Sequence, residues 1–119
     1  MNHKDLDAWK VSMMLAKLVF QETKSFPKNE QFGMTSQMRR AAVSVPANIA
    51  EGSARKGDKE FIQFLHIALG SLAELETLTI LAADFEYSSD KQKDSLLEQI
   101  TISSKLVYGM IKYLRNKKE

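Results

Sequence analysis

Six polar side chains recur every three or four residues and would share one helix face: Gln37, Arg40, Ser44, Asn48, Glu51 and Arg55. Such a face offers hydrogen-bonding groups and both charges, which suits a ligand, subunit or partner surface. Small neighbours such as Ala47 and Gly52 would let another helix approach closely. The structural alternative is that Ser44 and Asn48 satisfy backbone groups freed by Pro46, while Glu51 and Arg55 form an (i, i+4) ion pair.

Basic side chains flank the same stretch and are candidates for binding nucleic acid: Arg39, Arg40, Arg55, Lys56 and Lys59. Lysine and arginine neutralise phosphates, which makes such binding dependent on salt. No aromatic side chain lies among them to stack bases, as a single-strand binder would need. The C-terminal cations would extend this surface if the chain end lies near the second helix: Lys112, Arg115, Lys117 and Lys118.

The sequence offers no constellation for catalysis or metal binding. Glu74 and Glu76 are two residues apart on a predicted helix, so they point to different faces and suit intersubunit pairs with Arg39 or Arg40 better than acid–base chemistry. His66 has no acid or second histidine one helical turn away. There is no cysteine, phosphate-binding glycine loop or nucleophile elbow. We therefore expect no enzyme, no cofactor and no metal.

Length and composition fit one domain spanning residues 1–119, long enough to build a core without disulfides or metal. The absence of cysteine predicts a cytoplasmic protein. The N-terminus lacks the apolar block of a signal peptide. The longest apolar stretch, residues 72–83, is short and contains Glu74 and Glu76, so no membrane partner is expected.

Charge is unevenly distributed along the chain. The formal net charge is 17 − 15 = +2, too small by itself to imply a polyanionic partner. Between Lys59 and Lys91, however, there are six acidic residues and no lysine or arginine. Residues 105–118 reverse this pattern, with five cations and no acid. We therefore predict a negative face and a positive chain end.

Apolar residues at helical spacing predict four helices. The first covers about residues 5–25 and ends before Pro27; the second begins at Met34 or Thr35 and ends within residues 52–57. The third starts after an Asp58 cap, and the fourth after a Ser88 or Ser89 cap. The connector 27–33 is expected to be anchored by Phe26 and Phe32 packing under the bundle. Short connectors predict an all-α, up-down-up-down antiparallel four-helix bundle.

Two helix positions carry costs that need a reason. Pro46 lies inside the second helix, where a proline removes a hydrogen bond and collides with the carbonyl of Ala42, at about 3 kcal/mol. A bend is predicted there. Gly70 costs about 1 kcal/mol relative to alanine inside the third helix, and close helix approach with Ser71 is the expected reason.

The third helix is also too apolar to face one core only. Its inward stripe is Phe61, Leu65, Ala68, Leu72, Leu75, Thr79 and Ala82.

Several ordered motifs resemble one family. They are Asp5-Leu6 with Trp9, Phe26-Pro27-x-x-Glu30-x-Phe32-Gly33, Gln37-x-Arg39-Arg40-Ala41, Ser44-Val45-Pro46-Ala47-Asn48-Ile49-Ala50-Glu51-Gly52, Glu60-Phe61 and Gly70-Ser71-Leu72-x-Glu74-Leu75-Glu76. Nearly end to end, the chain resembles the four-helix-bundle proteins first noticed as reading frames in intervening sequences of 23S ribosomal RNA genes. That family is similar in fold to the accessory variability determinant of diversity-generating retroelements, a pentameric barrel that works with a reverse transcriptase and nucleic acid. The resemblance implies a bundle fold and a homopentamer.

The sequence thus favours a non-catalytic homo-oligomer, a pentamer by resemblance, whose basic surface contacts RNA or DNA, alone or alongside a protein partner. The alternative is a structural or adaptor module that binds a protein partner, and no nucleic acid, through the surface around Pro46. The candidate residues for a partner or subunit surface are Ser44, Asn48, Glu51, Gly70, Ser71 and Glu74. An enzyme is the least favoured option.

Overall fold

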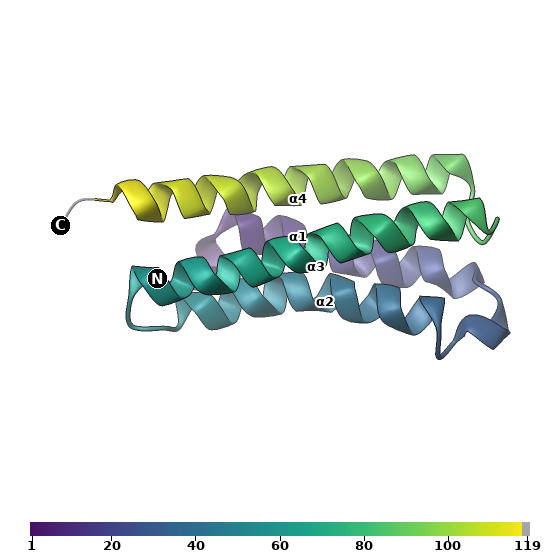
Figure 1. Ribbon diagram of the computed structural model, residues 1–119, viewed down its shortest axis with the longest axis horizontal. Coiled ribbons are helices and arrows are strands. Elements are labelled where there is room, and N and C mark those ends of the chain that lie inside the picture. The colour runs from purple at the N-terminus through teal and green to yellow at the C-terminus, as the bar shows by residue number, and fades with distance from the viewer. Residues whose placement is uncertain (118–119) are drawn as a thin grey trace.

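Four long α-helices make up most of the computed structural model, which describes residues 1–117. They are α1 (Asp7–Glu22), α2 (Met34–Ser53), α3 (Asp58–Asp84) and α4 (Asp90–Asn116) (Figure 1). Short 3-10 turns occupy His3–Asp5, Thr23–Ser25 and Lys28–Glu30, and residues 1–117 include no strand. The predicted class, all-α with four helices, is confirmed. The first helix is shorter than predicted because its chain tightens into a 3-10 turn ahead of Pro27, whose ring disfavours a helical residue before it.

The helix starts confirm one predicted cap and correct another. Ser89 caps α4 through a reciprocal pair: its hydroxyl accepts from the backbone N–H of Gln92 at 3.1 Å, and the Gln92 side chain accepts from the N–H of Ser89 at 2.9 Å. The prediction for Asp58 was wrong. Gly57, in an extended conformation, takes the cap position, and Asp58 is the first residue of α3. Its carboxylate lies 3.6 Å from the Lys117 ammonium.

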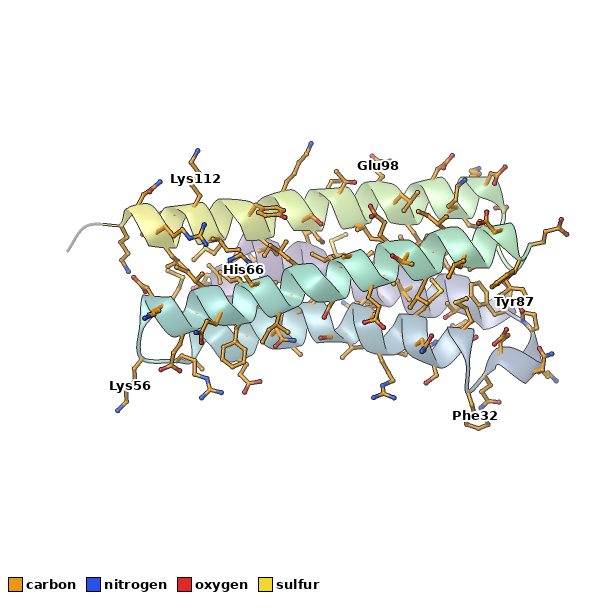
Figure 2. All side chains as sticks on the ribbon, viewed as in Figure 1. Phe32, Lys56, His66, Tyr87, Glu98 and Lys112 are labelled. Carbon is orange, nitrogen blue, oxygen red and sulfur yellow. The ribbon has the colours of Figure 1, made fainter. Side chains whose placement is uncertain are left out.

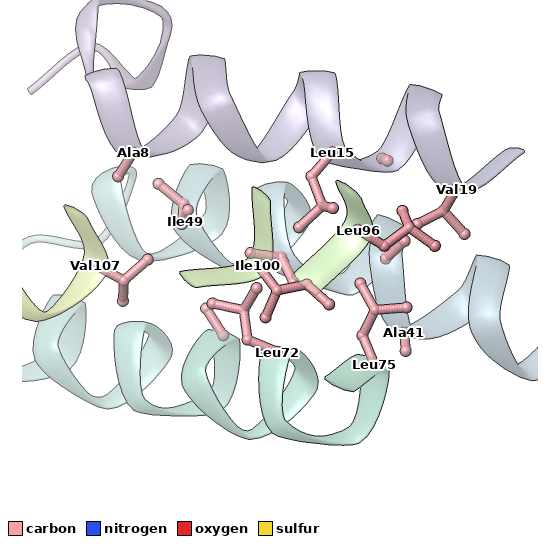
Figure 3. Close-up of a cluster of buried hydrophobic side chains, with 14 of the residues drawn as sticks. Ala8, Leu15, Val19, Ala41, Ile49, Leu72, Leu75, Leu96, Ile100 and Val107 are labelled. Carbon is pink, nitrogen blue, oxygen red and sulfur yellow. The ribbon is translucent and has the colours of Figure 1, made fainter. Parts of the chain in front are cut away.

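All seven residues of the predicted α3 stripe are buried, and they meet apolar side chains from the other three helices. Figure 3 shows Leu72 and Leu75 of α3 pointing into the same space as Leu15 of α1 and Ile100 of α4. Spacings of four and three residues keep these side chains on one side of a long helix. One continuous core therefore runs along the bundle.

Each helix packs against two neighbours: α2 lies against α1 and α3, and α4 lies against α3 and α1. The resulting bundle is elongated, 51 × 23 × 20 Å. The α1–α2 connector and the α3–α4 turn lie at one end, and the α2–α3 connection lies with the last turn of α4 at the other (Figure 1). This arrangement separates two ends of different composition.

Two glycines behave differently from each other. A Cβ at Gly52 would stand 2.7 Å from the Cβ of Phe64 and 2.8 Å from a ring carbon of Phe61, so α2 and α3 approach closely only because Gly52 has no side chain. Gly70 is exposed, and a Cβ there would meet nothing within 4 Å. The predicted role of Gly70 in close packing is therefore wrong within the chain, because α3 turns Gly70 toward solvent.

The connector between α1 and α2 was predicted half correctly. Phe26 is buried, at 7% exposure, but Phe32 is 91% exposed. The chain turns sharply here, since the N–H of Gly33 bonds to the carbonyl of Glu30 at 3.0 Å, and the turn carries Phe32 to the outside. Figure 2 shows Phe32 pointing away from the bundle. The expectation that Phe32 packs under the bundle was wrong.

By length and composition, α3 also passes a simple test for a membrane-crossing helix. Its most apolar 18-residue stretch has a mean hydropathy of 1.4, and 33% of that stretch is buried in the bundle. A helix that lines the core of a soluble bundle passes the same test.

Candidate nucleic-acid and partner surfaces

A polar network joins α2 to α3 along their shared seam. The hydroxyls of Ser44 and Ser71 lie 2.8 Å apart across the two helices. The Asn48 amide donates to the Ser44 hydroxyl at 2.9 Å and to the Ser44 carbonyl at 2.8 Å. The carbonyl freed by Pro46 belongs to Ala42, so Asn48 supports a different one, because a side chain four residues on reaches back one helical turn. Three of the predicted partner-surface residues thus form one network.

Beside this network lies a polar hollow of about 400 Å³, which Ser44 and Ser71 line together with Gln37, Arg40, Ala41 and Glu74. Arg40 and Glu74 are both exposed, and within residues 1–117 neither forms an ion pair. A cation and an anion thus stand free beside hydroxyl and amide groups. The structure therefore brings together five of the residues that the sequence singled out: Gln37, Arg40, Ser44, Ser71 and Glu74.

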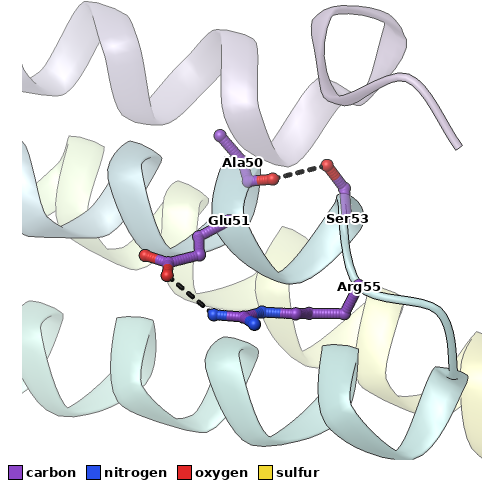
Figure 4. A network of polar contacts seen from close by, with 4 residues as sticks. All are labelled: Ala50, Glu51, Ser53 and Arg55. Atoms are coloured by element: carbon purple, nitrogen blue, oxygen red, sulfur yellow. Dashed lines mark hydrogen bonds and ion pairs between the residues drawn. The ribbon is translucent and has the colours of Figure 1, made fainter.

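Further along α2, the predicted (i, i+4) pair is confirmed. The Glu51 carboxylate lies 2.8 Å from the Arg55 guanidinium (Figure 4). The same guanidinium lies 4.8 Å from the centre of the Phe64 ring, a cation–π contact. Both charged side chains are about half exposed, so the pair itself stabilises the fold by at most about 1 kcal/mol. Arg55 is therefore held along the α2–α3 seam.

Arg39 and Arg40 are adjacent in sequence but serve different surfaces. The Arg39 guanidinium donates to the Thr23 hydroxyl at 2.9 Å and to the Phe20 carbonyl at 3.3 Å, and it lies 4.7 Å from the centre of the Phe20 ring. It ties the end of α1 to α2. Arg40 and Arg55 are 15 residues apart, or about 22 Å along a helix. The five predicted cations thus do not form one continuous patch.

The C-terminal cations, by contrast, do join the predicted cluster at one end of the molecule. Lys117 pairs with Asp58 at the start of α3, and the Arg115 guanidinium lies 3.3 Å from a ring nitrogen of His66 on α3. Figure 2 shows Lys112 and Lys56 at this same end. We call it the basic end and define it by Arg55, Lys56, Lys59, Lys112, Arg115 and Lys117. Lys118 lies outside the described residues.

The end of the bundle opposite the basic end carries exposed acids, and it holds a contact that the sequence did not predict. The Tyr87 hydroxyl donates to the Glu30 carboxylate at 2.7 Å and links the α3–α4 turn to the α1–α2 connector. This bond, followed by the backbone N–H of Met34, lowers the pKa of Glu30 below its ordinary 4.5. The same bond, followed by burial and the nearby negative charge, raises the pKa of Tyr87 above 10.0. No sequence signal connects residues 57 positions apart.

An apolar groove of about 550 Å³ runs between α1 and α2 on another face. Lys17 and Lys24 lie at its rim, and its apolar lining is Met13, Ala16, Phe20, Val43 and Pro46. The surface around Pro46 is therefore apolar and distinct from the polar hollow, although both belong to α2. Sequence periodicity did not predict this groove because it arises from the spacing between two helices.

Within residues 1–117 no three histidine or acidic side chains lie close enough to hold a metal ion. The surfaces described above can form hydrogen bonds, ion pairs and apolar contacts. Four helices around one core, with surfaces of this kind, define an all-α helical-bundle protein.

The family model of the 23S rRNA-intervening sequence proteins matches residues 4–109, and the chain belongs to this family. The chain is also similar to the crystal structure of a protein of unknown function from the S23 ribosomal protein family of Bacteroides thetaiotaomicron, with 28% sequence identity and a TM-score of 0.82. The similarity covers 88% of this chain and 95% of that one. No curated protein matches the sequence. The family resemblance read from the motifs is confirmed.

Proposed function

We propose that this protein is a non-catalytic homo-oligomer of the cytoplasm, a pentamer by its family's likeness to the accessory variability determinant, and that its basic end binds RNA or DNA. The observation that carries the proposal is the contact of the end of α4 with α3, through Lys117 with Asp58 and Arg115 with His66, which lies near Lys56 and Lys59. Cations from residues 55–59 and 112–117 thereby share one end of the molecule.

Electrostatics favours a polyanion at this end. Its six cations come from segments 51–60 and 112–117, which hold three acids, Glu51, Asp58 and Glu60, two of them paired with Arg55 and Lys117. Each phosphate that a cation neutralises releases counterions, so binding should weaken steeply with salt. One such patch is small. Several copies in a ring would present repeated patches, and multivalency raises avidity without new contacts.

The direct test is a titration of labelled structured RNA at several salt concentrations. The variant Lys56→Glu/Lys59→Glu changes the basic end, and Lys28→Glu/Lys91→Glu makes the same charge change at the other end; all four lysines are exposed. We expect the first variant to bind more weakly and with a shallower salt slope, by about 0.7 to 0.9 for each lost phosphate contact. Equal losses in both variants would remove the proposed site.

The oligomer and its location have separate tests. Size exclusion coupled to light scattering measures the mass of the assembly, and a monomer at micromolar concentration would contradict the pentamer. The cysteine-free sequence supports a cytoplasmic location, since cysteine pairing belongs to oxidising compartments. Recovery of the protein in a secreted or membrane fraction would contradict it.

We also infer an up-down-up-down helix order with a bend in α2 at Pro46. Short connectors that alternate between the two ends in Figure 1 support the order. The bend is supported by chemistry, because Pro46 has no N–H for the Ala42 carbonyl and its ring crowds that group. A straight α2 axis in a crystal structure would count against the bend.

The polar hollow favours a second candidate function, an adaptor that binds a protein partner. Arg40 and Glu74 line the same hollow as the Ser44 and Ser71 hydroxyls and have no ion-pair partner in the described chain, which suits a partner segment carrying both charges. A specific complex should then be lost in Arg40→Glu and kept in Lys56→Glu. The reverse pattern would assign the partner to the basic end and remove the adaptor site.

A further inference from the structure

Two exposed apolar features have no partner within residues 1–117: Phe32 and the α1–α2 groove. We propose that Phe32 of one copy inserts into the groove of a second copy, and that this contact joins successive copies of the assembly. The inference rests on the proposed homo-oligomer and names the surfaces that would hold it together.

Phe32 is presented by a rigid turn. At 91% exposure it is the most exposed large apolar side chain of residues 1–117. The turn is fixed by Glu30, whose carboxylate accepts from the N–H of Met34 at 3.1 Å and from the Tyr87 hydroxyl at 2.7 Å. A side chain at Gly33 would collide with the same carboxylate. Because the turn is already ordered, burying the ring would cost little conformational entropy.

The groove suits a ring in size and chemistry. Its volume of about 550 Å³ lies in the range of about 300–1,000 Å³ typical of binding pockets. Val43 and Phe20 leave apolar surface open to solvent, at 46% and 39% exposure. Pro46 contributes a stiff surface with no N–H left to satisfy, and Arg39 holds the Phe20 ring from one side. An aromatic anchor in such a pocket is a common interface hot spot.

Charge complementarity identifies the occupant as another copy of this chain. The groove is rimmed by Lys17 and Lys24. The end that bears Phe32 is acidic: segments 28–32 and 84–94 hold five acids and three lysines. Phe85 adds a second exposed ring there, 5.7 Å from the Tyr87 ring. In the proposed contact, the acidic end of one copy, with its exposed rings, meets the basic, apolar groove of the next copy. Complementary potentials favour this orientation of the two copies.

The contact must form between copies. The turn points Phe32 away from its own bundle (Figure 2), so it does not reach the groove of the same chain. Because the two surfaces are different patches, their pairing is heterologous and produces either a closed ring or an open filament. Neither surface includes a residue of the basic end, which stays free for nucleic acid.

The cysteine-free sequence permits a clean crosslinking test. Phe32→Cys and Val43→Cys are prepared separately, mixed and oxidised, so any disulfide between the two positions joins two chains. The matched control mixes Phe32→Cys with Ile102→Cys, an α4 residue of similar exposure to Val43, at 38%. We expect the 32–43 disulfide in clear excess over the 32–102 disulfide. Equal yields would overturn the proposal.

A second measurement separates this contact from the homo-oligomer itself. Because Phe32 is exposed, Phe32→Ser should leave the urea unfolding midpoint unchanged at concentrations where both proteins are monomers, while weakening assembly at least about tenfold, as for an aromatic hot spot. If the wild type is an oligomer and Phe32→Ser assembles equally well, the Phe32 contact fails and the homo-oligomer stands. If the wild type is a monomer, both fail.

Discussion

At Gly52 the backbone of α2 runs so close to α3 that one methyl group would not fit. The atoms it would meet are the Phe64 Cβ and a ring carbon of Phe61, both under 3 Å from the position of a Cβ. Neither is the free end of a flexible side chain, so a helix has to move. Gly109 on α4 shows the contrast, since a Cβ there would meet nothing within 4 Å. Gly52 is therefore required for helix packing, whereas Gly109 only carries the lower helix propensity of glycine.

We predict that Gly52→Ala lowers the free energy of unfolding by about 1–3 kcal/mol, the usual cost of overpacking. Gly109→Ala, the control, should raise it by about 0.5–1 kcal/mol because alanine favours the helix more. Urea unfolding followed by circular dichroism measures both. A stable Gly52→Ala would show that α2 and α3 separate without cost, against the packing described above.

The Glu30–Tyr87 bond makes the stability of the acidic end depend on pH. The pKa of Glu30 is lowered in the folded chain, so this carboxyl stabilises the fold above its unfolded pKa, and that stability is lost as pH falls below 4.5 through the folded value. The pKa of Tyr87 is raised, so its contribution is present below the unfolded value of 10.0 and is lost as pH rises through the folded one.

Tyr87→Phe should therefore reduce the loss of stability on the acid side, because the largest cause of the lowered Glu30 pKa is removed. The N–H of Met34 still favours the charged carboxyl, so part of the loss remains. Urea midpoints between pH 7 and pH 3 measure the effect, and Tyr108→Phe, at an exposed tyrosine of α4, is the control. Identical pH profiles for Tyr87→Phe and the wild type would contradict the assignment.

At the scale of elements, the regular periodicity of α3 explains why its buried stripe was predicted correctly from the sequence. Local chemistry also restricted the α4 cap to Ser88 or Ser89, and the structure assigns it to Ser89, whose partner Gln92 is only three residues away. The predictions that failed concern contacts between elements that are distant in the sequence. Phe32 is apolar like Phe26, but a turn set by the distant Tyr87 puts it outside.

For the candidate surfaces, too, the sequence predicted features within one helix and missed those that depend on contacts between helices. The sequence placed Arg40 and Ser44 on one helix face and named Ser71 and Glu74 as surface candidates, but it did not predict that they line one hollow. The basic end was left conditional, because only the fold brings the α4 terminus to the start of α3. The apolar groove was missed, since no pattern along one helix specifies the space between two.

For α3 we predict that Gly70→Ala raises the free energy of unfolding by about 0.5–1 kcal/mol. The position is exposed with open space around it, so alanine gains helix propensity without a clash. Urea unfolding of the isolated protein measures this change. A lower midpoint, or dissociation of an otherwise stable oligomer, would instead place a second chain against Gly70, beside the polar hollow.

The whole molecule is a rod 51 Å long whose two ends differ in charge. Its ends are 20–23 Å across, so parallel neighbours in a ring would place their basic ends on the order of 20 Å apart. A duplex advances about 3.4 Å per base pair, so about 6 base pairs span one end and about 30 span several. The length of the nucleic acid thus reports whether several ends act together.

We predict that the wild-type oligomer binds a duplex of about 30 base pairs 10²–10⁴-fold more tightly than a hairpin with a stem of about 6, at one salt concentration. The second contact becomes intramolecular once the first has formed, which supplies the gain. Phe32→Ser, if it dissociates the oligomer, should lose most of this gain while keeping its affinity for the hairpin, because the basic end is intact. Fluorescence anisotropy with both duplexes measures the ratio. The same ratio in the dissociated variant would mean that each chain binds alone, and the role proposed for the assembly would be wrong.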